Sequence, residues 1–174
     1  YGGTSYYWRG AVTNNYLKFG GYCWRIIRIN GDGSIRLIYD GTTCHANGKN
    51  SDSISVNNVM YNSNCDKSEY VGYTYKTGNQ RTTSGTSSNA KIQTEKWFSS
   101  NLSSFDTFIA NGKYCNDRDV ESGYSWSSQP VGKFYYATRR RLESVKIPTL
   151  ACPSGDVYTL KVGLITADEV AFAG

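Results

Sequence analysis

Several common sources of chemistry are missing from this 174-residue chain. It has one histidine, and its five cysteines form no C-x-x-C pair, so an ordinary Cys/His zinc site is excluded. No phosphate-binding loop, G-x-S-x-G sequence or H-E-x-x-H sequence occurs, and no apolar run is long enough to span a membrane. The sequence therefore carries no motif for nucleotide hydrolysis, serine-hydrolase chemistry or zinc proteolysis, and it predicts no membrane insertion.

Basic charge is in modest excess and is not concentrated. Lys and Arg together number 19 and Asp and Glu 14, which gives a formal net charge of +5. The only run of basic residues is Arg139–Arg141, which Glu143 follows closely. No basic stripe alternates with aromatic residues, so the pattern favours a solvated helix face over a surface that binds nucleic acid.

Tyrosine, by contrast, is abundant: the chain has 15 Tyr and 4 Trp beside one Met and three Pro. Tyrosine combines a large contact area with a hydrogen-bonding hydroxyl. Together with 18 glycines and many Asn, Ser and Thr residues, this composition is typical of a β-rich, loop-rich secreted protein. The length fits one domain over residues 1–174. Because the chain begins with Tyr1 rather than Met, we interpret it as a processed piece of a longer extracellular protein.

The cysteines bracket two polar stretches. Cys44 and Cys65 flank the first, and Cys115 and Cys152 flank the second, so we expect a disulfide in each pair. Cys23 lies among apolar neighbours and is expected to be a buried thiol. Reduced, purely structural cysteines are the alternative, because connectivity does not follow from sequence alone.

A hairpin over residues 22–40 is expected to organise the domain. Asn30–Gly33 supplies turn chemistry between two arms rich in β-branched and aromatic residues. The first arm is apolar on both faces, as in a central strand. In the second arm Ile35 and Leu37 alternate with Arg36, which predicts one packed face and one face in water.

The rest of the chain predicts short elements of both kinds. Strands are expected at 6–9, 16–19, 69–75 and 162–165, with a β-like patch at 54–60 and a mobile surface segment at 77–89. Helices are expected from Ala90, from a Ser103 cap, over 135–144 and from a Thr166–Glu169 capping box. The predicted fold class is α+β, an antiparallel sheet built on a central hairpin with short helices and many loops.

The densest group of carboxylates is Asp117, Asp119 and Glu121. Such a group could bind Ca²⁺ or supply the paired acids of a glycoside hydrolase. Catalytic carboxylates usually face each other from separate elements, so we interpret these three as loop residues that cap the backbone or pair with Arg118.

Three further candidates have structural interpretations. Residues 30–35 imitate part of an EF-hand loop but lack its first and last carboxylates, which favours a hairpin turn. Cys44 and His45 are adjacent and seldom able to form a dyad, and a disulfide would consume the thiol. Asp168 and Glu169 are explained by the start of a helix. The sequence therefore predicts no catalytic residue, metal ligand or cofactor.

Four strings together resemble a known family: WRIIRINGDGSIRLIYDGTT, CNDRDV, PTLACP and VGLITADEVAFAG. The family consists of extracellular surface domains of gut-dwelling Gram-positive bacteria and has no assigned activity. More distantly, the order of elements is similar to C-type-lectin-like and sulfatase-modifying-factor-like domains. The EPN/QPD and WND motifs of calcium-dependent lectins are absent, so no sugar or calcium site is implied. Family members continue past VAFAG into further strands, so the resemblance implies a C-type-lectin-like fold without its C-terminal strands.

These observations lead to one expected function and two alternatives. We expect a secreted or surface-displayed bacterial module that acts by binding or adhesion, with a host or bacterial glycan or a surface protein as its partner. The alternatives are a structural subunit of a surface appendage, completed by neighbouring subunits, and a polysaccharide hydrolase. Neither nucleic acid nor direct membrane insertion is expected.

Overall fold

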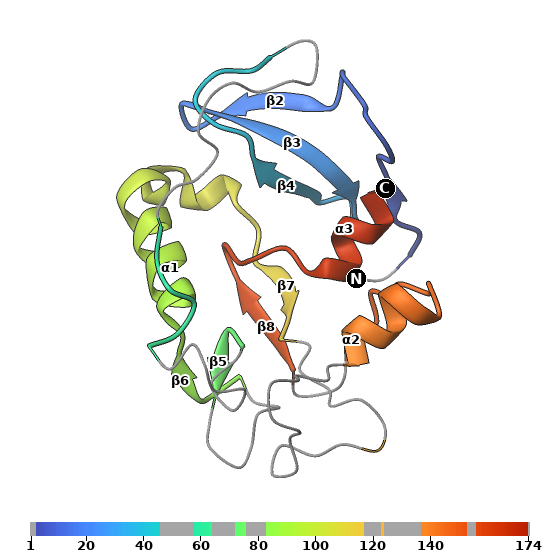
Figure 1. The fold of residues 1–174 in the computed structure, drawn as a ribbon. Coiled ribbons are helices and arrows are strands. Elements are labelled where there is room, and N and C mark those ends of the chain that lie inside the picture. The colour runs from blue at the N-terminus through green and yellow to red at the C-terminus, as the bar shows by residue number, and fades with distance from the viewer. Residues whose placement is uncertain are drawn as a thin grey trace.

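The computed structural model describes residues 3–45, 58–63, 72–75, 83–116, 123, 137–152 and 156–173. Antiparallel sheets and a few short helices make up this part of the chain, which confirms the α+β class (Figure 1). The strands are β1 (Tyr6–Tyr7), β2 (Tyr16–Phe19), β3 (Tyr22–Ile29), β4 (Ile35–Tyr39), β5 (Thr74–Tyr75), β6 (Thr86–Ser87), β7 (Gly112–Cys115) and β8 (Val157–Leu160). The helices are α1 (Asn89–Asn101), the 3-10 helix η2 (Ser103–Phe108), α2 (Ala137–Arg139), the π-helical turn η3 (Arg140–Ser144) and α3 (Ala167–Ala173).

The expected hairpin is present and β3 is the central strand of its sheet. β4 pairs with one edge of β3, while β2 and β1 pair with successive segments of the other edge. The turn closes through a hydrogen bond from the Gly33 amide to the Asn30 carbonyl, 2.9 Å long. Gly33 has φ +84°, a conformation that a residue without Cβ adopts at little cost.

A β-bulge changes the register of the hairpin. Ile26 lies opposite Leu37, but the next pair along is Arg28 with Arg36, so β3 carries one extra residue at this point. The extra residue places Arg28 on the same face as Arg36. Arg36 is 8% exposed, while Ile35 is 50% exposed. The expectation that the Arg36 side of β4 meets water was therefore wrong, because this face is covered by residues from α3 and β7.

An aromatic cluster attaches α1 to the sheet. Trp24 and Tyr39 lie opposite each other, and the Trp97 ring of α1 packs against both, with ring centroids 6.3 and 5.4 Å away. Ser88 caps α1 by accepting a hydrogen bond from the Lys91 amide, and it is fully buried. The mobile segment predicted for residues 77–89 is therefore wrong at its end, since Ser88 belongs to the packed start of a helix. Residues 77–82 of that segment lie outside the described residues.

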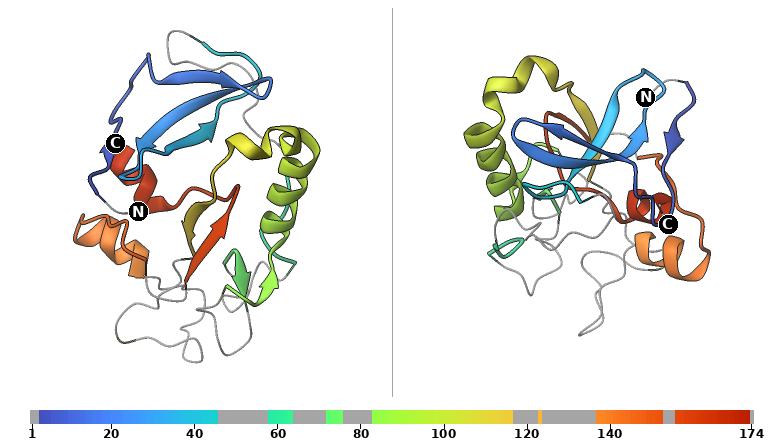
Figure 2. Two further views of the ribbon diagram at one scale, coloured as in Figure 1. Left: turned by 180° about the vertical axis from the view of Figure 1, so that it is seen from behind. Right: turned by 90° about the horizontal axis from the view of Figure 1, so that it is seen from above.

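β7 and β8 form a separate two-stranded sheet between α1 on one side and α3 with the α2 segment on the other (Figures 1 and 2). β7 had no counterpart in the sequence analysis. The final strand was expected at 162–165, but β8 occupies Val157–Leu160 and residues 161–166 are irregular. The apolar run at 162–165 therefore belongs to the connection between β8 and α3 and not to a strand.

The remaining elements agree with the predictions to different degrees. β2 has the expected bounds, β1 is shorter, and β5 occupies only the end of the expected 69–75 strand, whose residues 69–71 lie outside the described residues. Residues 58–60 show no strand, and 54–57 are outside the described residues. The helix expected at Ser103 is η2, which Leu102 precedes as its cap without a side-chain bond. The short helix expected within 135–144 is α2 followed by η3.

Two disulfides connect distant segments. The Cys115–Cys152 pair forms as expected, with Cα atoms 5.7 Å apart. Cys44 is bonded to Cys23 instead of Cys65, with Cα atoms 5.2 Å apart, so both the expected Cys44–Cys65 bridge and the free Cys23 thiol were wrong. The reason is local, because backbone hydrogen bonds between Cys23 and residues 40 and 41 bring the chain that leaves β4 back past Cys23. Cys65 itself lies outside the described residues.

The two disulfides fit an extracellular protein, because such bonds persist in oxidising compartments. Within the part of the chain that the structure describes, no helix is both long enough and apolar enough to cross a membrane.

Candidate ligand-binding site

A buried ion-pair cluster joins the hairpin to α3. Arg28 and Arg36 lie directly opposite each other, and like charges in that position repel. Glu169 of α3 compensates them: its carboxylate lies 3.5 Å from Arg28 Nη1 and 3.2 Å from Arg36 Nε. All three side chains are less than one-tenth exposed. A single carboxylate therefore holds two buried cations in place.

The start of α3 positions Glu169. Thr166 and Glu169 form the predicted capping box, in which the Glu169 amide donates to Thr166 Oγ1 and the Thr166 amide donates to Glu169 Oε2. Farther along α3, Phe172 stacks on Tyr7 with ring centroids 5.2 Å apart. The helix is thus fixed against β1 at one end and against the arginines at the other.

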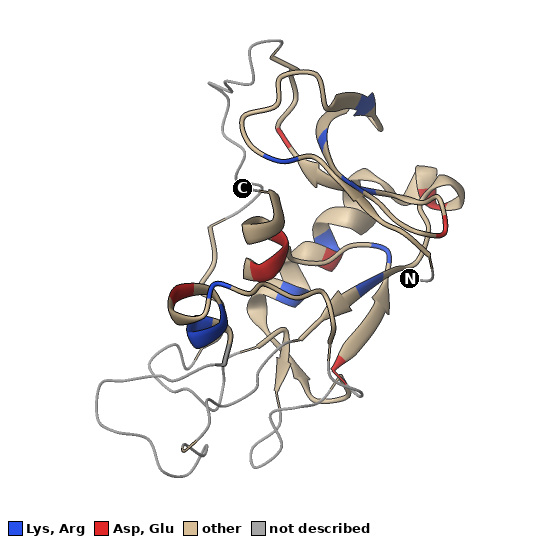
Figure 3. Ribbon diagram, turned by 90° about the vertical axis from the view of Figure 1, so that its right-hand side faces the viewer, with Lys and Arg blue, Asp and Glu red and all other residues tan. Residues whose placement is uncertain are grey.

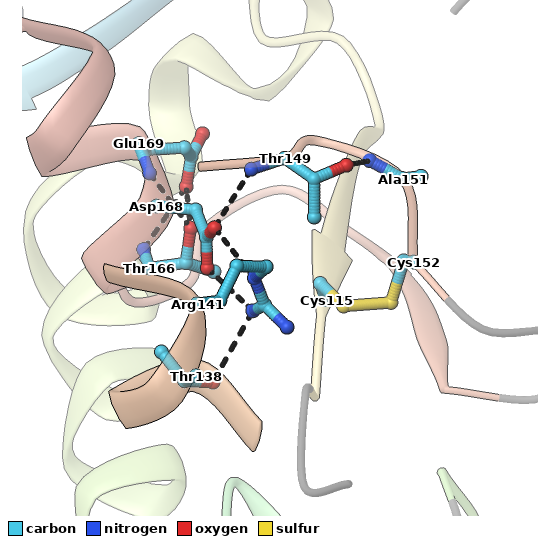
Figure 4. Close-up of polar contacts among 9 residues, drawn as sticks. All are labelled: Cys115, Thr138, Arg141, Thr149, Ala151, Cys152, Thr166, Asp168 and Glu169. Carbon is cyan, nitrogen blue, oxygen red and sulfur yellow. Dashed lines mark hydrogen bonds and ion pairs between the residues drawn. A yellow bond between two sulfur atoms is a disulfide. The ribbon is translucent and has the colours of Figure 1, made fainter. Parts of the chain in front are cut away.

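Asp168, the neighbouring residue, binds a third arginine (Figure 4). Arg141 donates to it through Nε at 2.9 Å and Nη2 at 2.7 Å, and the Thr149 amide donates to the same carboxylate at 2.8 Å. Burial raises the pKa of Asp168, but these donors outweigh burial and hold the pKa below its ordinary value. Asp168 is therefore a fixed anion that links η3, the loop before Cys152 and α3.

Beside these ion pairs is a cavity of about 420 Å³, which we call the basic cavity. Its cationic lining residues are Arg28, which is buried, Arg141, which is partly exposed, and Lys113 of β7, which is exposed. The carboxylates of Asp168 and Glu169 also line it. Figure 3 shows the acidic turn of α3 beside the basic α2 segment. The other lining residues are Ser5, Tyr114, Cys115, Thr149, Leu150, Ala151, Cys152, Val157 and Thr166.

A second cavity, of about 530 Å³, is lined by tyrosines from four segments, and we call it the tyrosine cavity. Tyr73 and Tyr158 pack edge to face, with centroids 5.4 Å apart, and both are buried. Burial raises the pKa of Tyr73 well above its ordinary value. The lining is completed by Tyr61, Gly72, Tyr114, Cys115, Asn116, Thr138, Arg139, Leu142, Glu143, Leu164, Ile165, Thr166, Ala167 and Asp168.

Tyr114 of β7 belongs to the wall between the two cavities. Its ring lies against the Arg36 guanidinium, whose central carbon is 3.9 Å from the ring centroid. On another side the ring packs on Gly163, where an added Cβ would overlap the ring atoms. Gly163 therefore leaves the space that this tyrosine occupies, which accounts for a glycine in the connection between β8 and α3.

The predicted candidate residues have different places in the structure. Asp117, Asp119 and Glu121 lie outside the described residues. The hydrolase alternative therefore gains no structural support from them. Cys44 is in a disulfide, which rules out a Cys44–His45 dyad in this state. The EF-hand-like segment is a hairpin turn, in which Asp32 accepts hydrogen bonds from the Ser34 amide and hydroxyl that lower its pKa. Among the described residues, no group of three or more His, Cys, Asp or Glu could hold a metal ion.

Asp168 and Glu169 were predicted as helix-start residues, and Glu169 has that role. That both also bind arginines was not predicted from the sequence. The available signal was the placement of Arg28 and Arg36 within otherwise apolar strands, because a charge in such a strand needs a partner when its face is buried. The role of Arg141 was not predicted either, because this residue was interpreted as part of a solvated helix face.

Comparison with known proteins adds no assignment. No protein-family model matches the chain, and no curated protein or solved structure shows significant similarity to it.

Proposed function

We propose that this protein is an extracellular binding module that holds an acidic sugar in the basic cavity. One observation carries the proposal: a buried guanidinium, that of Arg28, lines a cavity whose other cations are Lys113 and Arg141. The two carboxylates in the lining already accept bonds from arginines. The lining therefore has three cations against two carboxylates, and this net positive charge favours an anionic ligand.

The ligand class follows from the donors. Guanidinium groups bind planar carboxylates through paired N–H donors, as Arg141 does with Asp168. Lys113 adds a point charge at the exposed side of the cavity. Threonine and serine hydroxyls in the same lining suit the hydroxyls of a sugar. The volume is within the range of about 300–1,000 Å³ that is usual for small-molecule sites.

This proposal belongs to the class of function expected from the sequence. Binding at a cell surface agrees with the two disulfides and with the resemblance to bacterial surface domains. A uronic acid within a glycan of a cell surface is a ligand of the required chemistry, and adhesion is the process that such binding would serve.

Isothermal titration of the whole chain with galacturonate tests the proposal. The methyl ester of the same sugar is the matched neutral probe. We expect the acid to bind and the ester to bind more weakly, with an affinity for the acid that falls as salt is added. The Lys113→Gln variant should bind galacturonate about two- to five-fold more weakly. Lys18→Gln removes the same charge from an exposed position on β2 and should leave the affinity unchanged.

Two results would overturn the proposal. One is the absence of binding for galacturonate up to concentrations at which weak sugar sites saturate. The other is an equal affinity for the acid and its ester that neither lysine variant alters, because the cationic lining would then play no part.

A further inference from the structure

The tyrosine cavity adjoins the basic cavity. Tyr114, Cys115, Thr166 and Asp168 belong to the lining of both. Because the two cavities share these lining residues, a molecule bound in one lies next to the other. Figure 4 shows three of these four residues around the Arg141–Asp168 pair and the Cys115–Cys152 disulfide.

The two cavities differ in chemistry. Arg139 and Glu143, the ionic residues that line only the tyrosine cavity, are exposed and bind each other at 2.8 Å. The rest of its lining includes four tyrosines and the aliphatic residues Leu142, Leu164 and Ile165. The Asn116 side chain bonds to backbone groups of Tyr73 and Thr74. Aromatic rings pack against the apolar face of a sugar ring, and tyrosine hydroxyls offer hydrogen bonds at its edge. A charged group of a ligand gains less electrostatic stabilisation in the tyrosine cavity than in the basic cavity.

We propose that the tyrosine cavity is a second subsite, which binds the sugar ring adjacent to the acidic group held in the basic cavity. The inference rests on the proposed function and narrows its ligand class to an acidic oligosaccharide of two or more units. The acidic group supplies the ionic contacts with Arg28, Lys113 and Arg141, and the neighbouring ring supplies contact with the tyrosines.

Titration with galacturonate and digalacturonate tests this division. Tyr61, at 42% exposure, is the accessible tyrosine of the second cavity, so its replacement should leave the fold intact. In Tyr61→Ala we expect digalacturonate to bind about 2- to 12-fold more weakly and galacturonate to bind as in the wild type. Tyr61→Phe keeps the ring and should restore most of the lost affinity. Phe108→Ala, an exposed aromatic residue outside both cavities, is the matched control.

The outcomes separate this inference from the proposed function. If neither acid binds, the proposed function is wrong. If galacturonate binds but digalacturonate binds no tighter, or if Tyr61→Ala weakens both acids equally or neither, the second subsite is wrong and the basic cavity remains the binding site. A loss confined to digalacturonate supports the second subsite.

Discussion

The two ends of the β3–β4 hairpin are stabilised by different interactions. At the aromatic end, Trp24 and Tyr39 lie opposite each other and pack against Trp97 of α1. At the arginine end, Arg28 and Arg36 lie opposite each other and bind Glu169 of α3. Burial of aromatic area is non-directional and shared among many atoms, whereas the arginine end depends on one carboxylate.

The two ends differ in how much stability is lost when one interacting side chain is changed. A cluster of rings retains most of its buried area when one ring is trimmed. Two opposed arginines without Glu169 are buried like charges that have lost the ion pair they share. The comparison therefore predicts that a small chemical change at the arginine end costs more stability than a larger one at the aromatic end.

The largest expected effect comes from Glu169→Gln, which removes the charge and keeps the size. Breaking a buried ion pair by removing one partner costs about 3–5 kcal/mol. We expect a fall of that order in the free energy of unfolding, measured with urea so that the denaturant adds no salt. Glu143→Gln is the matched control, because its carboxylate pairs with Arg139 at the surface. Its effect should stay below about 0.5 kcal/mol, and equal losses in the two variants would contradict the comparison.

A smaller effect is expected from Trp24→Phe at the aromatic end. This change removes the bond from the indole Nε1 to the Phe19 carbonyl, 2.9 Å long, and part of the ring area. The Phe19 acceptor is partly buried, so leaving it without its donor costs at most about 1–3 kcal/mol. The variant should still unfold cooperatively in urea. A loss greater than that of Glu169→Gln would mean that the aromatic end is the more sensitive of the two.

The sequence predicted the aromatic end better than the arginine end, for a physical reason. Apolar patterning is local, so the hairpin, β2 and the helix that carries Trp97 follow from residues close together in the chain. The partner of Arg36 is 133 residues away in sequence, and no local pattern identifies it. The bulge adds to this difficulty, because one extra residue on β3 places Arg28 on the same face of the sheet as Arg36.

In the candidate site too, local features followed from the sequence and tertiary contacts did not. The capping box at Thr166 was readable because its two residues are three apart and satisfy each other. The cavities were not readable, because β7, η3 and the Cys152 loop meet only through tertiary contacts. The predicted Cys44–Cys65 pair was wrong for a related reason, because the prediction considered loop length alone. Backbone hydrogen bonds after β4 place Cys44 beside Cys23 instead.

The ion pair of Asp168 makes the stability of the fold depend on pH. The pKa of Asp168 is lowered in the folded state, so the charged form stabilises the fold above the unfolded pKa of about 3.9. That stability is lost as the pH falls through the folded pKa. We expect Asp168→Asn to be less stable than the wild type at neutral pH. The difference should shrink as the pH falls from about 4 through the lowered pKa of Asp168. Urea unfolding between neutral and strongly acidic pH measures this, and parallel profiles would contradict it. The loss at neutral pH should be smaller than in Glu169→Gln, because Arg141 is 20% exposed and regains water.

The smallest effect concerns which residue at the start of β4 is buried. The alternating pattern of β4 predicts Ile35 inside and Arg36 outside, whereas in the structure Ile35 is half exposed and Arg36 is buried. Ile35→Thr keeps a β-branched residue and should change the free energy of unfolding by less than about 0.5 kcal/mol, as surface substitutions usually do. Arg36→Gln, one residue away, should cost several times more, because it removes two contacts with Glu169. If Ile35→Thr were the more damaging of the two, Ile35 rather than Arg36 would be the residue that this end of β4 buries, and Arg36 would not depend on Glu169 of α3.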